Sequence, residues 1–223
     1  LLAGITDADG VAGDLGGGSL ELIDIEKGKI RHGVTLPIGP LRLIDMSGGS
    51  ISTARKLVDE YFDNTPVIER LKGRNFYAVG GTWRNLARIH MAQTHYPLHV
   101  LHYYTISREQ ARSVADLVAG LSASSLKDIK AVSRSRSDTL PFGALVLERL
   151  LSRAKAKNVI ISVLGVREGL LYSKLPKRKA ELDPLLAGCW DFCRRYARSP
   201  EHELELCDWT SGLFQSGSLA EGP

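Results

Sequence analysis

Three consecutive glycines between two apolar segments constrain this chain more than any other feature of its sequence. Residues 14–21 read DLGGGSLE; residues 11–15 are short and apolar, and residues 20–26 alternate between apolar and polar side chains. Glycine accepts positive φ angles and has no side chain, so the run suits a turn between two strands. Residues 30–36 follow the tight turn Lys27-Gly28 as a third strand candidate. The pattern predicts a three-stranded meander.

Helical and strand patterns alternate after the meander. Thr82 and Ser107 are each expected to be the N-cap of a helix. Strands are predicted at residues 75–79 and 158–163, and helices at 52–62, at 83–91, from Ser107 to 119, from Asp138 to 153, and at 167–172. This order predicts an α/β fold in which helices flank a mixed five-stranded sheet.

The composition changes after the basic stretch PKRK at residues 176–179. Residues 182–197 and 201–214 resemble two amphipathic helices, and residues 216–223 show no pattern. We therefore expect two domains: residues 1–175, and residues 176–223 as a linker with the start of a helical domain. The chain also begins without Met, so we expect a piece of a longer protein, cut at both ends.

Composition narrows the class of protein. The 223 residues are 43% hydrophobic and carry a formal charge of +4, which suits an anionic ligand, although many proteins carry such a charge without one. Apolar runs are too short for a membrane span, and the basic stretch lacks the interleaved aromatic residues of a nucleic-acid site. The three cysteines form no C-x-x-C pair, so we expect reduced thiols in the cytoplasm.

The glycine run and its neighbours suit phosphate chemistry. Successive backbone N–H groups in such a turn can converge on a phosphate. Asp14, at a strand end, is suited to hold Mg²⁺ through water, and Ser19 can donate its hydroxyl to a phosphate oxygen. Glu21 shares a strand face with Ser19, so its carboxylate can bind the metal's waters or orient an attacking water. The alternative is a glycine-rich hairpin without a ligand.

A second glycine turn follows the predicted strand at residues 75–79. Gly80-Gly81-Thr82 links this strand to a helix start, where free N–H groups and the helix dipole attract anions. Close packing of strand on helix is the other explanation. Two phosphate loops in one sheet domain are what a polyphosphate or nucleotide cleft requires. By contrast, a zinc site among the histidines of residues 90–102 is not expected, because a loop with proline separates them and no cysteine is near.

Several segments together resemble one family. DLGGGSLE resembles the D-[IL]-G-G-G-S-x-E motif of the exopolyphosphatase and guanosine-pentaphosphatase (Ppx/GppA) family, with Leu20 where Thr is commoner. Residues 80–82, RSDTLPFG at 136–143 and GVREGLLY at 165–172 resemble further family segments in the expected order. The resemblance covers about residues 10–175. It implies the second ribonuclease H-like domain of the actin, sugar kinase and chaperone ATPase fold.

The resemblance also implies a reaction and site residues. The reaction is hydrolysis of the terminal phosphoanhydride bonds of polyphosphate with Mg²⁺, releasing orthophosphate. The family's E-E-A segment with its catalytic glutamate is absent here, since residues 5–10 read ITDADG. The implied roles are catalysis by Glu21 and Asp14, metal binding by Asp14, phosphate binding by Gly16, Gly17, Gly18, Ser19, Gly80, Gly81 and Thr82, and substrate or nucleotide binding by Arg136.

Three alternatives stay open: hydrolysis of guanosine pentaphosphate, a non-catalytic module that senses guanosine tetraphosphate, and a sugar or acetate kinase-like phosphotransferase. The segment REGLLY speaks against the last of these. For the full-length protein we expect a cytoplasmic homodimer in the stringent response, without nucleic-acid or membrane partners. The chain alone is expected to be inactive, because half of the cleft would be missing.

Overall fold

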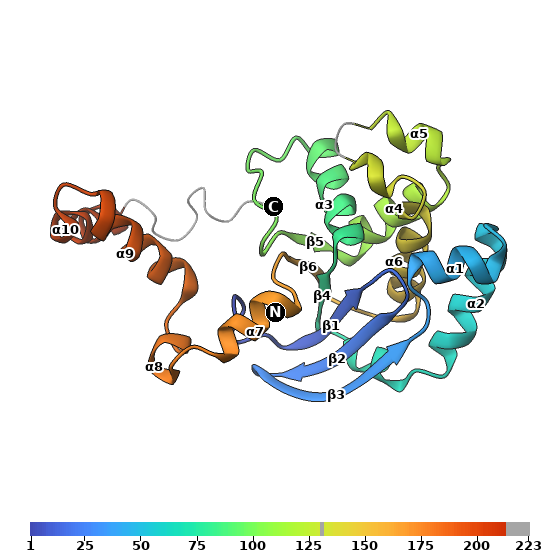
Figure 1. Ribbon diagram of the computed structural model, residues 1–223, viewed down its shortest axis with the longest axis horizontal. Coiled ribbons are helices and arrows are strands. Elements are labelled where there is room, and N and C mark those ends of the chain that lie inside the picture. Colours follow the sequence, from blue (N-terminus) through green and yellow to red (C-terminus); the bar gives the residue numbers. More distant parts are fainter. Residues whose placement is uncertain (130–131, 213–223) are drawn as a thin grey trace. The chain divides into compact units, whose positions relative to one another are not determined.

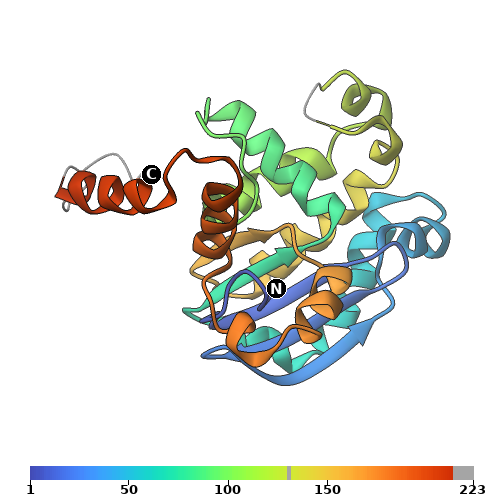
Figure 2. The same ribbon diagram turned by 60° about the vertical axis from the view of Figure 1, so that its left-hand side comes forward.

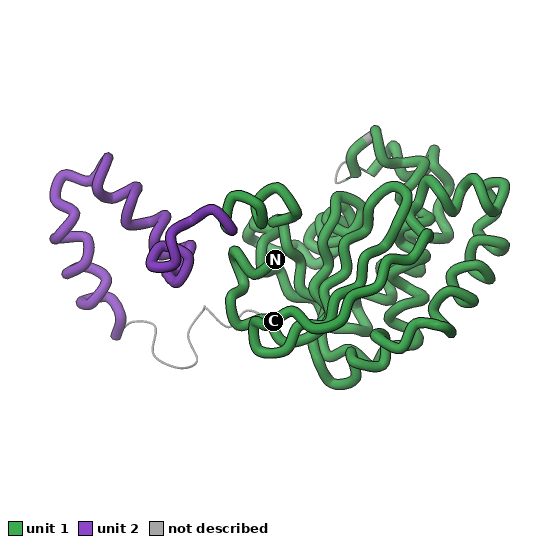
Figure 3. The backbone as a smooth tube through the Cα atoms, turned by 60° about the horizontal axis from the view of Figure 1, so that its bottom comes forward, with its two compact units in different colours: residues 1–172 green, residues 173–223 purple. Residues whose placement is uncertain are grey.

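The structure is a computed structural model that describes residues 1–129 and 132–212, apart from the side chain of Arg134. The chain divides into two compact units, residues 1–172 and residues 173–223 (Figure 3). Within the described residues, no helix combines the length and the apolar character that crossing a membrane requires.

Unit 1 is built on a six-stranded mixed sheet in the order β3-β2-β1-β4-β6-β5 (Figure 1). The strands β1, β4 and β6 run parallel, and β2, β3 and β5 are antiparallel to their neighbours. The bounds are β1 Gly10–Leu15, β2 Leu20–Glu26, β3 Lys29–Leu36, β4 Asn75–Val79, β5 Thr105–Ser107 and β6 Asn158–Ser162. The meander and the α/β class are confirmed.

The predicted number of five strands is wrong, because β5 adds a sixth strand at the sheet edge. This strand has only three residues and pairs with β6, with Thr105 opposite Ile160 and Ser107 opposite Asn158. Three residues are too few for an alternating pattern to stand out in the sequence. Ser107 is both the last residue of β5 and the N-cap of the next helix, so the helix signal obscured the strand.

Most helices of unit 1 cover one face of the sheet. The large core lies between this face and the helices α2, α3, α4 and α6. A small cluster of Ile5, Ala8, Ala12, Tyr77 and neighbours lies on the other face, where Figures 1 and 2 also show α7. The bounds are α1 Pro40–Ser47, α2 Ile51–Asp63, α3 Gly81–Gln93, α4 Arg108–Ala119, α5 Ala123–Lys127, α6 Leu140–Arg153 and α7 Val166–Ser173, with short 3₁₀ helices η1 Pro66–Leu71 and η2 Arg134–Arg136.

Local signals placed most helix starts correctly. The Ser107 side chain accepts a hydrogen bond from the Gln110 N–H at 3.3 Å, as expected of an N-cap. Thr82 is not an N-cap: α3 begins at Gly81 after Gly80, and Thr82 is buried in its first turn. Helix α1 was not predicted, because its eight residues lie between Gly39-Pro40 and Gly48-Gly49 and read as a loop.

The described part of unit 2, residues 173–212, contains α8 Lys177–Ala180, α9 Pro184–Tyr196 and α10 Pro200–Ser211. In these three helices, all of which the structure describes, no residue is buried. The two predicted helices are present as α9 and α10, which start and end within a few residues of the expected bounds. Residues 213–223, which include the end of the second predicted helix and the patternless segment, lie outside the described residues.

Candidate functional site

The glycine run forms the turn between β1 and β2. The Gly16 N–H donates to the Ser19 carbonyl at 3.0 Å, and the Leu41 N–H donates to the Gly17 carbonyl at 2.9 Å. None of the three glycines has a positive φ, so this part of the sequence argument is wrong. What glycine supplies is open space: a Cβ built on Gly18 would meet no atom within 4 Å. No side chain therefore plugs this side of the turn.

The backbone of Gly39 packs directly against the glycine turn, and the sequence argument did not identify this residue. A Cβ on Gly39 would lie 2.5 Å from the Gly17 carbonyl oxygen and would also clash with the Ser19 N–H. Pro40 follows as the first residue of α1, so this helix begins against the turn. The dipeptide Gly39-Pro40 was the available signal, since glycine permits close backbone approach and proline suits a first helical position.

Asp14 and Glu21 project to the same side of the sheet. They are partners in the antiparallel ladder of β1 and β2, and residues directly opposite each other share a face. The Ser19 hydroxyl donates to Glu21 Oε1 at 2.5 Å, which fixes both side chains. Burial raises the pKa of Asp14, and the nearby Glu21 carboxylate raises it further. Two carboxylates in this arrangement, here called the acid pair, favour a bound cation.

The acid pair fits a magnesium ion that keeps most of its waters. The described residues contain no group of three or more His, Cys, Asp or Glu able to hold a metal ion. A site at Asp14 would then use one or two protein carboxylates, with water and phosphate oxygens completing the coordination. Mg²⁺ is bound in this way in many phosphate sites, because it dehydrates reluctantly.

A cleft of about 440 Å³, here called the loop cleft, joins the two glycine turns. It brings together Gly16, Gly17, Gly81, Thr82 and Arg136, which the sequence placed far apart. The remaining lining residues are Leu15, Pro40, Leu41, Ser135 and Thr139. Leu15 lines this cleft, whereas its strand neighbour Asp14 points to the other face of the sheet. The loop cleft and the acid pair therefore lie on either side of the glycine turn, which borders both.

The second glycine turn combines close packing with a place in the loop cleft. Gly80 has a φ of +113°, and a Cβ there would lie 2.7 Å from the Leu15 carbonyl oxygen. A Cβ on Gly81 would lie 2.5 Å from the guanidinium carbon of Arg136. Arg136 therefore lies against the N-terminal turn of α3. Close packing against Leu15 explains why residue 80 is a glycine, and the nearby side chain of Arg136 explains why residue 81 is one.

Gly143 and Glu168 lie in the segments that resemble the family, but the sequence analysis gave neither residue a role. Gly143 of α6 faces Thr82, and a Cβ on this glycine would clash with the Thr82 methyl group. The Trp83 indole N–H donates to the Gly143 carbonyl at 3.0 Å, so α6 and α3 meet closely here. Glu168 of α7 accepts a hydrogen bond from the Gly165 N–H at 2.7 Å, which lowers the pKa of the Glu168 carboxyl.

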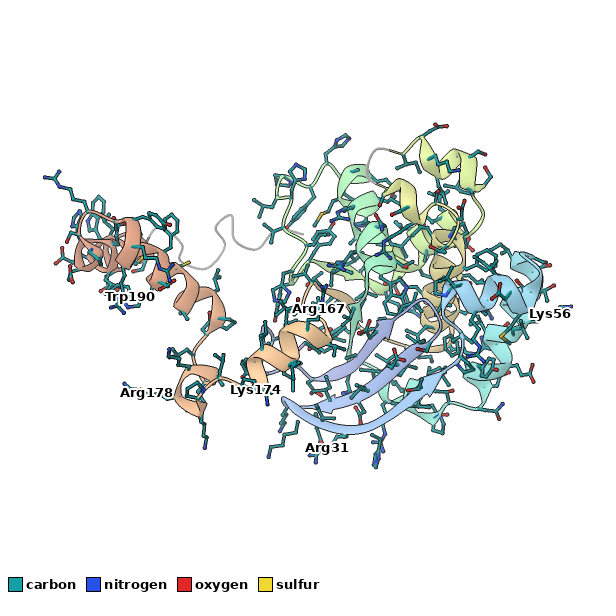
Figure 4. The ribbon with its side chains drawn as sticks, viewed as in Figure 1. Arg31, Lys56, Arg167, Lys174, Arg178 and Trp190 are labelled. Atoms are coloured by element: carbon teal, nitrogen blue, oxygen red, sulfur yellow. The ribbon has the colours of Figure 1, made fainter. Side chains whose placement is uncertain are left out.

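Several other polar and basic side chains lie elsewhere in the fold. His90 is buried and shares a 2.7 Å hydrogen bond with the Tyr104 hydroxyl, which is a packing role. Lys155 and Lys157 precede β6, whereas Arg167 follows it on α7 (Figure 4), so these cations do not share one end of the sheet. A cavity of about 780 Å³ between the ends of α2, η1 and α6 is larger than the loop cleft, but contains none of the predicted site residues.

Comparison with known proteins gives a consistent answer. The sequence matches the model of the Ppx/GppA phosphatase family over residues 2–178. No curated protein sequence matches the chain. Among solved structures, the Ppx/GppA family member of Aquifex aeolicus is 21% identical with a TM-score of 0.64, and the match covers 78% of this chain and 58% of that one.

Two further structures have a similar fold. An exopolyphosphatase from Cytophaga hutchinsonii is 21% identical with a TM-score of 0.65, covering 78% of this chain and 61% of its own. An exopolyphosphatase-like protein is 23% identical with a TM-score of 0.64, covering 74% and 58%. The chain thus spans about three fifths of the length of these structures, and the expected actin-like fold is confirmed.

Proposed function

Because the chain belongs to the Ppx/GppA phosphatase family, we propose that it is part of an exopolyphosphatase that hydrolyses the terminal phosphoanhydride bond of inorganic polyphosphate. The observation that carries the proposal is the acid pair, Asp14 opposite Glu21, beside a glycine turn that is open at Gly18. Carboxylates for a metal and an open turn for a phosphate lie next to each other, as phosphoryl transfer requires.

Each residue of the acid pair has a distinct part in this reaction. Asp14 holds the waters of the metal ion, whose charge, when bound, stabilises the transferred phosphoryl group. Glu21 is fixed by its 2.5 Å hydrogen bond to Ser19 and orients the attacking water at the same face. N–H groups of the glycine turn bind oxygens of the terminal phosphate. The catalytic glutamate and the first phosphate loop come from the part of the protein that precedes this chain in the family.

Guanosine pentaphosphate is the second candidate substrate, and the loop cleft favours it. Leu41 is 57% exposed and forms an apolar wall with Leu15 and Pro40, while Arg136 lies on the polar side. Inorganic polyphosphate has no apolar surface to cover this wall, whereas a nucleoside has one. A non-catalytic module that senses guanosine tetraphosphate would use the same wall and would bind without turnover.

We propose the same assignments for the whole protein as for its family. Residues 1–175 form the second actin-like domain, residues 176–223 begin a helical domain, and Mg²⁺ is the metal ion. The full-length protein is a cytoplasmic homodimer that acts in the stringent response. The family match supports a phosphatase, and the other assignments are proposals carried over from the resemblance.

Phosphate release tests the proposal. Long-chain polyphosphate and guanosine pentaphosphate are each incubated with Mg²⁺ and either the full-length protein or this chain alone. We expect turnover by the full-length protein, a loss of at least 100-fold in Asp14→Asn and in Glu21→Gln, and none by the chain alone. Asp45→Asn, at an exposed position on α1, is the matched control and should be unaffected. Full activity in Asp14→Asn would contradict the proposal, and binding of guanosine tetraphosphate without any turnover would favour the sensing module.

A further inference from the structure

We propose that Arg84 is an additional phosphate-binding residue, which contacts the phosphoryl group held at the acid pair. This inference rests on the proposed function and goes beyond it, because neither the motifs nor the family match assigns a role to Arg84. Three observations carry it: the place of Arg84 on α3, its lack of a partner, and the acids that surround it without contact.

The neighbours of Arg84 fix the first turn of α3. Trp83 is fully buried against α6, and the buried Asn85 donates to the Gly81 carbonyl at 2.9 Å and accepts from the Ser133 N–H at 3.3 Å. Successive helix positions are about 100° apart, so these contacts leave Arg84 on a separate side of the helix. Side chains in a helix also lean toward its N-terminus, which brings the guanidinium toward the end of the sheet where Asp14 lies.

Arg84 differs from the other partly buried arginines. Among the residues whose side chains the structure describes, every other partly buried arginine makes an ion pair: Arg55, Arg74, Arg108, Arg149 and Arg153. The Arg84 side chain is also half-buried, but it makes no hydrogen bond or ion pair in the described part of the chain. A guanidinium that has lost part of its water without gaining a partner is costly, and a bound anion removes this cost.

Two carboxylates lie near Arg84 without touching it. Burial and Glu21 raise the pKa of Asp14, and the positive charges of the Leu1 amino group and of Arg84 act in the opposite direction. The pKa of Glu168 is lowered first by the Gly165 N–H and then by Arg167 and Arg84. Neither carboxylate comes within 4.0 Å of an Arg84 nitrogen. The arginine thus lies near both acids without an ion pair to either.

A phosphoryl group bound with a metal ion would match these charges. The acid pair would hold the metal through its waters, and Arg84 would donate to phosphate oxygens that the metal does not contact. Arginine is suited to this role because its planar guanidinium can donate two parallel hydrogen bonds to a phosphate. A role limited to holding Asp14 and Glu168 in place would instead predict direct ion pairs with them.

Calorimetric titration of the whole chain with inorganic tripolyphosphate in the presence of Mg²⁺ tests the role of Arg84. We expect Arg84→Gln to weaken binding at least tenfold and Arg84→Lys to weaken it less, because lysine keeps the charge but not the paired donors. Arg88→Gln, at an exposed position one turn later on α3, should bind like the wild type. Without ligand, the thermal midpoint of Arg84→Gln should stay near that of the wild type, because the side chain has no partner to lose.

The possible failures are distinguishable. If Arg84→Gln binds like the wild type while Asp14→Asn and Arg136→Gln bind more weakly, the role of Arg84 is wrong and the proposed function stands. If neither the wild-type chain nor the full-length protein binds tripolyphosphate, both fail. If Arg84→Gln does not fold, Arg84→Lys decides: unchanged affinity and a lowered thermal midpoint in this variant would make Arg84 a structural residue and overturn the inference.

Discussion

Asp14 and Glu21 lie directly opposite each other in the ladder of β1 and β2, with both carboxylates on the face of the sheet away from the main core. The two strands thereby hold like charges together at a half-buried position. A protein gains no stability from this arrangement, and we propose that a bound cation offsets its cost.

Asp14→Asn should stabilise the chain at neutral pH when no metal is present. The folded-state pKa of Asp14 is raised by burial and by Glu21, so the ionised form opposes folding. Stability is therefore greater below the unfolded-state pKa and is lost as the pH rises through the folded-state pKa. Because Asp14 is half-exposed, we expect a gain of less than about 1 kcal/mol at pH 7.

Urea unfolding at pH 7 and at pH 3 measures this effect. At pH 3 the carboxyl is protonated in both states, so the gain from Asp14→Asn should disappear. An equal gain at both pH values would show that ionisation is not its cause. Adding Mg²⁺ with tripolyphosphate should reverse the order at pH 7, because the wild type then gains ligand binding that the variant lacks.

Gly39→Ala should disrupt the glycine turn although residue 39 lies outside it. The new Cβ would lie 2.5 Å from the Gly17 carbonyl oxygen, and the backbone of the turn would have to move. We expect a loss of about 1–3 kcal/mol in the free energy of unfolding, as for other overpacked sites. Gly18→Ala is the matched control, because a Cβ there meets no atom within 4 Å. Similar losses of stability in the two variants would contradict the close contact.

Gly143→Ala should destabilise the contact between α6 and α3, and Thr82→Ser should restore part of the loss. The Cβ added at residue 143 would clash mainly with the Thr82 methyl group, which serine lacks. We expect Gly143→Ala to cost about 1–3 kcal/mol, and a double-mutant cycle of unfolding free energies to show a coupling of at least about 0.5 kcal/mol. Additive effects would place the strain elsewhere, for example at Leu15.

Alternation along β2 was enough to predict that Ser19 and Glu21 share a face, because a strand has a strict period of two. The same argument could not supply Gly39 or α1, since contacts between the turn and a later segment leave no periodic trace. Thr82 failed as an N-cap for a related reason. Its local sequence suits a cap, but the approach of Gly80 to Leu15 and of Gly143 to Thr82 sets where α3 begins. Residues that meet only in the fold are what sequence patterns miss.

Leu41→Ser should separate the two candidate substrates of the loop cleft. The Leu41 side chain is 57% exposed and forms the apolar wall with Leu15 and Pro40, so replacing it removes surface that only a nucleoside can cover. We expect the affinity for guanosine tetraphosphate to fall about 5- to 20-fold, which corresponds to the loss of about 1–2 kcal/mol of apolar contact. The affinity for tripolyphosphate in Mg²⁺ should not change, because phosphate contacts come from the glycine turns and Arg136. Calorimetric titration of both ligands, with Leu98→Ser at another exposed leucine as the control, makes the comparison. Equal effects on the two ligands would mean that Leu41 supports the glycine turn rather than a nucleoside, and polyphosphate would remain the better supported substrate.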